Sequence, residues 1–507
     1  MSWIERIISP IAPGLALRRL TAKQAFNANV RAYQAAQRTR THRAERQSAT
    51  ANTSVGRDAL SLREQARKLD EDHDLVIGML DKLEERVIGA NGIMVEPQPL
   101  DLEGNVLTEL QEEIRRRWAS WSLKCEVTGT YTRPELERMA LRTAFRDGEI
   151  FGQLVRGNVA GLTHPNPNGS PFSIEALEAD FVPLHLTDIA NRIRQGIERN
   201  AWGRVVAYHV FYDNPGDSFG LTAKTKRVAQ GNMLHLAHRH RLHQLRGVSV
   251  LHGVLTRLAD IKDYEESERV AARIAAALAF YIKKGTPDLY TPPQDEVANR
   301  QIPFSPGTCF DDLRAGEEIG MIESNRPNTH LTKFRDGQIR MISSGVRGTT
   351  YSSVARDYNG TYSAQRQELV EGQGGVEVSQ QWFVAQWSRP VYRAWLEMEL
   401  LRTDKPLNVP DNIDQHTLFD AVYLAPTMPW IDPVKESKSW KERIKGGGAT
   451  QAQWIRASGG TPSEVKRQRS AELKENKELG LHFDTDTIPP TGEQPNGTAN
   501  GTDTTTS

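Results

Sequence analysis

The stretch that decides the fold is LHGVLTRLADIKDYEESERVAARIAAALAFYIKK, residues 251–284. Apolar residues recur along it at spacings of three and four, which predicts one helix about 50 Å long at roughly 1.5 Å per residue. Residues 257–268 hold two bases and five acids, whereas residues 269–284 hold four bases and no acid. That order complements the helix dipole. The second half is also rich in alanine, which would let neighbouring helices approach closely.

The segments around this helix predict a chain that mixes helices and strands. Apolar spacing upstream indicates helices over residues 60–87, 107–121 and 132–147. Clusters of β-branched and aromatic residues indicate strands over residues 149–155, 174–186 and 204–212. Downstream, helical patterns return over residues 331–345, 361–400 and 433–445, after a proline-broken segment at 285–330. The predicted fold class is α+β, with residues 60–250 as one mixed unit.

Two local signals mark the ends of the upstream helices. Thr132, Pro134 and Glu135 suit a capping box with proline in the first turn. Gly89 and Gly92 suit a helix stop at which the backbone φ angle is positive. These signals predict where two of the helices begin and end.

The composition excludes several classes of protein. The chain has 507 residues with 64 basic and 64 acidic side chains, so it carries no formal net charge. Affinity for nucleic acid would therefore have to come from local basic patches. The longest strongly apolar run, residues 274–282, is far shorter than the roughly 20 residues that cross a bilayer. The cysteines, Cys125 and Cys309, make neither a disulfide framework nor a usual zinc site. We expect a soluble, cytosolic protein without a membrane anchor.

The start of the chain differs from the rest in charge. The first fifty residues hold nine bases and two acids and few large apolar side chains. Such a segment buries too little apolar surface to offset the chain entropy that it would lose on folding. We predict a basic, largely mobile arm over residues 1–59, either simply solvated or in contact with nucleic acid or a scaffold protein.

No catalytic site is expected from the motifs. The chain has no phosphate-binding P-loop, no His-Glu-x-x-His and no Gly-x-Ser-x-Gly pattern. Imidazoles that lie close together could bind a transition metal, and a histidine cluster occurs at His235, His238, His240 and His243. Because Arg239 and Arg241 are interleaved, we favour a polar loop or an inter-subunit surface over a metal site. Acid pairs at 311–312 and 317–318 are either a solvated loop or a magnesium site of nuclease type.

Several segments that hold no candidate catalytic residues resemble motifs of a known family. The motifs are VIGANGI (87–93), RDGE (146–149), QLRGVS (244–249), FSPGTCFDDLRAGEEI (304–319), the stretch 334–345, YSSVAR (351–356), YSAQR (362–366), PVYRAWL (390–396) and WIDPVKE (430–436). In this order, over residues 60–475, they resemble the lambda-type portal proteins of tailed bacteriophages. Each motif alone is modest, but together they are specific.

The resemblance implies a portal-type fold that assembles into a ring. It implies a wing-like α+β domain (60–250), a stem helix (251–284), a clip (285–330), a return stem helix with tunnel loop (331–362) and a wing helix with helical crown (363–483). Composition predicts the basic arm (1–59) before them and a disordered tail (484–507) after them. A long amphipathic helix with too few partners in its own chain can bury its apolar stripe against copies of itself in a closed ring.

The resemblance also implies a function and partners. Portals are dodecameric head–tail connectors at one capsid vertex, and they form the channel for packaging and ejecting double-stranded DNA. The implied partners are the terminase large subunit, the major capsid or scaffold protein, and neck or head-completion proteins. The implied location is the virion, with assembly in the host cytoplasm. Neither a cofactor nor an enzymatic activity is implied.

A channel that slides duplex DNA needs few lumen-facing bases, because phosphate contacts hold the duplex irrespective of its sequence. The candidates are Lys283, Lys284, Arg335, Arg340, Arg347 and Arg356. The alternative for each is an inter-subunit salt bridge to the acids at 260–268. Two other functions stay open. One is a different ring component of the capsid or neck, and the other is a metal-dependent nuclease built on the His and Asp clusters.

Overall fold

The computed structural model describes residues 49–216, 224–276, 280–284, 317–321, 331–428, 432–481 and 483. The chain divides into two compact units, Met1–Ser54 and Val55–Ser507. Among the described residues, all the strands and all the helices except the start of α3 (Ala51–Asp72) lie in the second unit. Within the described residues, no helix is both long enough and apolar enough to cross a membrane.

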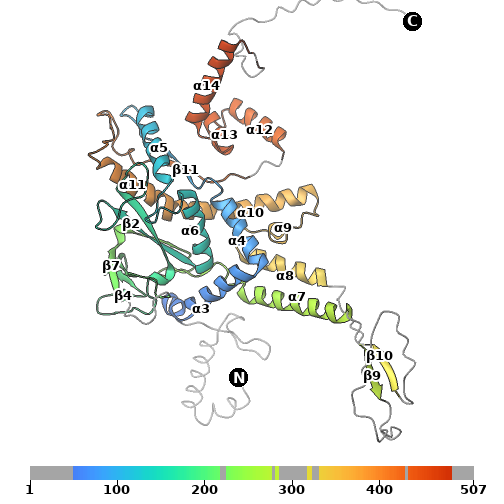
Figure 1. Cartoon of the computed structure of the whole chain (residues 1–507). Coiled ribbons are helices and arrows are strands. Elements are labelled where there is room, and N and C mark those ends of the chain that lie inside the picture. The colour runs from blue at the N-terminus through green and yellow to red at the C-terminus, as the bar shows by residue number, and fades with distance from the viewer. Residues whose placement is uncertain are drawn as a thin grey trace, which may run out of the picture. The chain divides into compact units, whose positions relative to one another are not determined.

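Helices make up most of the regular structure (Figure 1). They are α3 (Ala51–Asp72), α4 (Asp74–Val87), α5 (Thr108–Ser122), α6 (Arg133–Asp147), α7 (Leu255–Ala276), α8 (Leu331–Gly345), α9 (Tyr351–Ala355), α10 (Tyr362–Phe383), α11 (Arg389–Leu400), α12 (Pro433–Lys445), α13 (Gln451–Ala457) and α14 (Pro462–Leu479). The predicted capping box of Thr132 and Glu135 opens α6, and the Thr132 N–H donates to Glu135 Oε2 at 2.9 Å. Gly89 and Gly92, past the end of α4, have the predicted positive φ angles of 70° and 69°.

The strands form small antiparallel sheets. They are β1 (Met94–Pro97), β2 (Glu149–Arg156), β3 (Phe172–Glu178), β4 (Ile193–Arg194), β5 (Ile197–Arg199), β6 (Val205–Phe211), β7 (Thr225–Ala229), β8 (Met233–Ala237), β9 (Phe280–Lys284), β10 (Glu317–Met321) and β11 (Ala421–Leu424). One sheet has the order β3-β2-β8 and another is the meander β4-β5-β6-β7. β1 pairs with β11, so a strand from after α11 completes a sheet begun before α5. Helices and sheets together confirm a mixed α and β chain.

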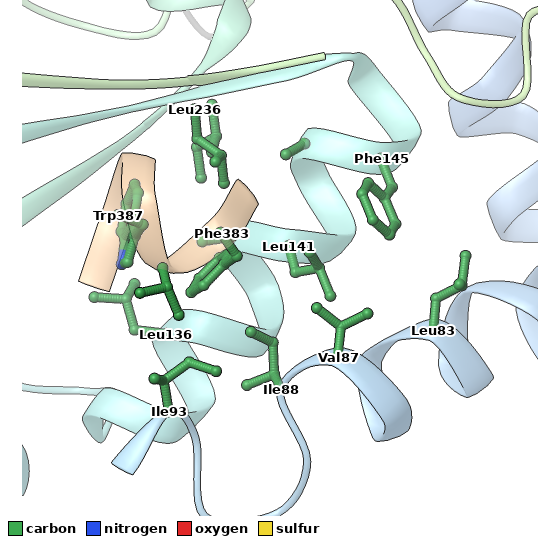
Figure 2. Packing of buried hydrophobic residues seen from close by; sticks show 14 of the residues in the cluster. Leu83, Val87, Ile88, Ile93, Leu136, Leu141, Phe145, Leu236, Phe383 and Trp387 are labelled. Carbon is green, nitrogen blue, oxygen red and sulfur yellow. The ribbon is translucent and has the colours of Figure 1, made fainter. Parts of the chain in front are cut away.

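The main core lies where α4, α6 and α10 meet β2 and β8. Figure 2 shows its central side chains, which include Leu83, Val87, Leu141, Phe145 and Phe383. A second, smaller core lies between β2 and the meander and includes Phe151 and Tyr208. Burial of this much apolar surface is the main force that holds the segments together.

The helix predicted over residues 251–284 is shorter in the structure, and this prediction was wrong at both ends. Residues 251–254 form turns, α7 ends at Ala276, and residues 280–284 form β9. β9 pairs with β10, with Ile282 opposite Ile319. Alanine is the best helix former, but intrinsic propensity is a weak determinant, and the β-branched and aromatic residues after the alanines gain a strand partner far along the chain. Tertiary pairing therefore overrides the local helical pattern.

The predicted helix over residues 361–400 contains a break. A π-helical turn, Val384–Ser388, joins α10 to α11. Pro390 has no N–H to donate to the carbonyl of Gln386, so the regular ladder cannot continue there. The Arg389 N–H instead reaches back to the carbonyl of Val384.

The boundary predicted for the N-terminal arm, at residue 59, is also wrong. Helix α3 already begins at Ala51, and Val55 and Ala59 are buried along it. Further along the helix, Arg63 and Arg67 bind carboxylates of the α+β unit and hold α3 against it. Residues 1–48 and the predicted tail 484–507 lie outside the described residues.

Candidate nucleic-acid interface

Helices α7 and α8 pack against each other (Figure 1). A Cβ atom at Gly345 would stand only 2.6 Å from Cγ1 of Val254, the residue before α7, so glycine lets the end of α8 pack closely against that side chain. Further along the pair, the rings of Tyr264 and Phe334 lie 5.0 Å apart. The end of α8 therefore meets the start of α7, which makes the pair antiparallel.

Two of the six candidate bases on or near α8 already have partners within the chain. Arg335 Nε lies 2.6 Å from Glu265 Oε1 on α7. This is the salt bridge weighed as the alternative, and here it forms within one chain. The guanidinium of Arg340 stacks over the ring of Tyr351 at 4.7 Å, in cation–π geometry.

Arg347 and Arg356 are the candidate bases whose positive charge is least compensated by neighbouring groups. Both side chains are exposed and flank the short helix α9, which Thr350 caps. Among the described residues, neither forms an ion pair with a carboxylate. Arg356 ends α9 in the left-handed region at φ 52°, which turns the chain sharply toward α10.

Lys283 and Lys284 lie on β9, not on a helix. Lys283 Nζ is 4.0 Å from Glu318 Oε2 on β10, and both side chains are mostly exposed. A pair of that kind contributes little to stability. Lys284 is opposite Glu317 in the register, and its side chain lies outside the described part of the chain.

Two sequence motifs that lie far apart meet in one buried contact. Glu149 of RDGE and Arg246 of QLRGVS are 97 residues apart, and Arg246 Nε donates to Glu149 Oε1 at 2.7 Å. Neither side chain is exposed. The Gly247 N–H donates to the other carboxylate oxygen at 2.8 Å. A Cβ atom at Gly247 would overlap the carbonyl oxygen of Gly148. The glycines in both motifs are therefore required by close packing of the backbone.

An arginine–carboxylate network joins α3 to this contact. Arg63 Nη2 donates to Glu149 at 3.3 Å and its Nη1 donates to Asp180 at 2.8 Å. Arg67 binds Asp147 and Asp180, each at 2.6 Å. Removing one member of a buried pair leaves an uncompensated charge, so the network fixes where α3 lies. The sequence showed the charges but not which ones meet.

His235, from the predicted histidine cluster, belongs to the same network. Arg239 Nη2 donates to His235 Nδ1 at 3.1 Å, so Nε2 carries the proton and donates to Glu149 Oε2 at 3.0 Å. Burial lowers the pKa of His235 to about 4. Burial alone would raise the pKa of Glu149, but the charge of Arg246 and the bond from His235 hold it well below its usual range. Both ring nitrogens of His235 are engaged and are not available to a metal ion.

The other histidines lie at the loop that leads into α7. The ring centroids of His238 and His240 are 4.6 Å apart, and those of His240 and His252 are 4.7 Å apart. His243 sits in the left-handed region at φ 64°. Over the described ranges, no group of three or more His, Cys, Asp or Glu side chains is arranged to hold a metal ion. The acid pair at 311–312 lies outside those ranges.

The structure contains a cavity that the sequence did not predict. It has a volume of about 520 Å³ and opens between β6, β8 and α11. We call it the arginine cleft, because Arg156, Arg204, Arg239 and Arg393 line it. These arginines are spread over almost 240 positions of the chain. No spacing rule would have brought them together.

The chain is similar to portal proteins along most of its length. Residues 37–380 match the lambda family of phage portal proteins. A probable portal protein of Halomonas phage phiHAP-1 is 24% identical over 472 residues, which cover 87% of this chain and 88% of that protein.

Two solved chains that match this chain over most of its length come from gene transfer agent particles. A chain in the neck of the empty particle is 12% identical with a TM-score of 0.48, and the match covers 80% of this chain and 94% of that one. A chain in the virion of the native particle is 11% identical with a TM-score of 0.41 at the same coverage.

Proposed function

Because the chain belongs to the lambda family of phage portal proteins, we propose that it forms a dodecameric ring at one vertex of a phage capsid. The ring encloses the channel through which DNA is packaged and ejected. It docks the terminase large subunit during packaging in the host cytoplasm and the neck proteins afterwards, and it contacts the capsid or scaffold protein. The observation that carries this proposal is the family match over residues 37–380, which includes the buried contact of the two motifs and the α7–α8 pair.

The α7–α8 pair supports assembly, because it leaves apolar side chains uncovered in a single chain. Val270 on α7 is 44% exposed, and Phe334 and Met341 on α8 are 47% and 59% exposed. In a closed ring, identical copies bring the same patch against its complement on the neighbour. Obligate interfaces of this type bury about 2,000 Å² or more, and apolar side chains are enriched at their centres.

The test of the ring is the mass and symmetry of the purified particle, by native mass spectrometry with negative-stain images. A ring of about a dozen copies with a central hole supports the proposal. The double variant Val270→Glu with Met341→Glu should remain folded but lose the ring. Leu102→Glu, at an exposed apolar residue away from α7 and α8, is the matched control and should keep it. Purified wild-type protein that stays monomeric with its scaffold protein present would contradict the proposal.

The channel wall should carry only a few bases from each copy. We propose Arg347 and Arg356 first, since they are exposed and form no ion pair among the described residues. Arg335, Arg340, Lys283 and Lys284 remain proposals for the same wall. Transport is then driven by the terminase and the portal has no chemistry of its own. Hydrolysis of ATP by the pure protein would contradict this assignment.

A further inference from the structure

The arginine cleft is strongly cationic. Of the charged side chains that line it, four are arginines and one is a carboxylate, Glu397. Arg156 Nη1 binds Glu397 at 3.0 Å, so one charge is neutralised. Arg204 is exposed and forms no ion pair within the described part of the chain. The lining of the cleft therefore has an excess of positive charge, with four guanidinium groups and one carboxylate.

The remaining two arginines are held in place by other groups. Arg239 donates through Nε to the carbonyl of Leu245 at 3.2 Å and through Nη2 to His235. The guanidinium of Arg393 lies 5.1 Å from the ring centre of Phe419. Guanidinium groups that are already oriented lose little entropy when they bind a carboxylate.

The floor of the cleft is apolar and its wall contains an irregular helix. The apolar lining residues are Leu154, Val205, Tyr208, Met233, Leu234 and Ala394. Gln386, in the π-helical turn, and Pro390 form part of the wall. Single π-helical turns inside α-helices occur often at functional sites. The cavity volume is in the range of pockets that bind peptides and small molecules.

An exposed tryptophan lies two residues before Arg204, which lines the cleft. Trp202 is 94% exposed and lies in the turn that carries Arg204. Asn200 Oδ1 accepts from the N–H groups of both Trp202 and Arg204, each at 2.9 Å. A rigid turn that presents a large aromatic side chain to solvent is typical of an anchor in a protein interface.

We propose that the arginine cleft docks an acidic peptide segment of a partner protein. The segment places carboxylates on Arg204 and Arg393, two lining arginines that are exposed and form no ion pair within the described residues, and one apolar side chain on the floor, while Trp202 packs against its flank. An apolar floor stabilises a bound apolar side chain of a peptide but does not stabilise the charged phosphate backbone of duplex DNA. This favours protein over nucleic acid as the occupant. This site goes beyond the proposed function, because it requires neither the ring nor the channel.

The test uses the full-length protein and a short synthetic probe. The probe is a fluorescein-labelled peptide with one leucine flanked on each side by glutamate and aspartate. Binding is followed by fluorescence anisotropy at several salt concentrations. We expect binding that weakens with salt and is lost when the acids are replaced by their amides or the leucine by serine.

Charge variants locate the binding. Arg204→Glu and Arg393→Gln should each raise the dissociation constant of the probe about tenfold or more. Lys224→Glu is the matched control. Lys224 is an exposed base next to the sheet of β6 and β7, but it precedes Thr225 at the start of β7, whereas Arg204 lies near the other end of that strand. It should leave the dissociation constant within about twofold of wild type. Circular dichroism of each variant confirms that it is folded.

Three outcomes would overturn the proposal. The first is no binding of the probe up to about 1 mM. The second is an equal loss of binding in Lys224→Glu and Arg204→Glu, which would mean a diffuse charge effect. The third is displacement of the probe by a thymidine oligonucleotide whose own affinity depends on Arg204, which would make the cleft a nucleic-acid site. None of these outcomes bears on the ring, whose mass is measured separately.

Discussion

Single glycines decide whether the two motifs can meet. A Cβ atom at Gly247 would overlap the carbonyl oxygen of Gly148, and one at Gly148 would overlap the backbone of Val248 and Ser249. Glu149 and Arg246 pair beside these glycines. Gly148 also has a φ of 94°, which L-residues rarely adopt. The contact thus depends on the absence of two Cβ atoms as much as on the ion pair.

We predict that Gly247→Ala lowers the free energy of unfolding by about 3 kcal/mol or more, because its methyl group overlaps backbone that cannot move aside. Gly253→Ala is the matched control, since a Cβ atom there meets open space. It should change the stability by at most about 0.5 kcal/mol. Urea denaturation of the purified proteins measures both. Equal stabilities of the two variants would show that the contact is not tight.

At the scale of elements, the α7–α8 pair combines a packed seam with a few exposed bases. Glu265 neutralises Arg335 within the pair, whereas Arg347 and Arg356 lie beyond the end of α8 without such a partner. The packing of α7 against α8 therefore separates a neutralised base from bases without a carboxylate partner, which the sequence alone could not do.

Replacing Arg347 or Arg356 by alanine should weaken binding of duplex DNA to the purified ring, since each removal deletes a phosphate contact. The slope of log K against log salt should become shallower by about 1 per lost contact. Arg335→Ala should change the slope less than either variant, because Glu265 already compensates that charge. Packaging rate and packaged DNA length should change in the same order. Unchanged packaging with Arg347→Ala and Arg356→Ala would remove both residues from the channel wall.

Across the whole molecule, buried histidines make stability depend on pH. Burial lowers the pKa of both His235 and His238 to about 4, from an ordinary value near 6.5. Between these pH values the unfolded chain binds protons that the folded chain does not, so stability falls as the pH falls through this window. Glu149 acts in the same direction at lower pH. Its pKa is lower in the folded chain than in the unfolded chain, so it stabilises the fold at pH values above the ordinary carboxyl pKa, and this stabilisation is lost as the pH falls further.

We therefore expect the free energy of unfolding to drop between pH 6.5 and pH 4 by about 1.4 kcal/mol per pH unit for each proton taken up on unfolding. Urea denaturation at pH 7, 6 and 5 would measure this slope. His235→Asn cannot take up that proton, so its slope should be smaller by one proton. An identical slope in wild type and variant would show that His235 does not contribute.

Local rules account for much of what could be predicted. The capping box at Thr132, the glycine stop after α4, the helix over residues 331–345 and the strand that becomes β2 all depend on neighbours in the sequence. Side-chain spacing and backbone preference act over one or two helical turns, so a single chain segment contains the information. The order of motifs was likewise sufficient to identify the portal family.

Only the tertiary structure decided the features that need distant partners. Residues 280–284 became a strand because β10 offers backbone hydrogen bonds, and β11 completes a sheet with β1 from the other end of the chain. Glu149 and Arg246 meet, Arg335 pairs with Glu265, and four arginines gather in one cleft. Pairing of strands and charges depends on distance in space, which packing of the core sets and the order of residues along the chain does not reveal.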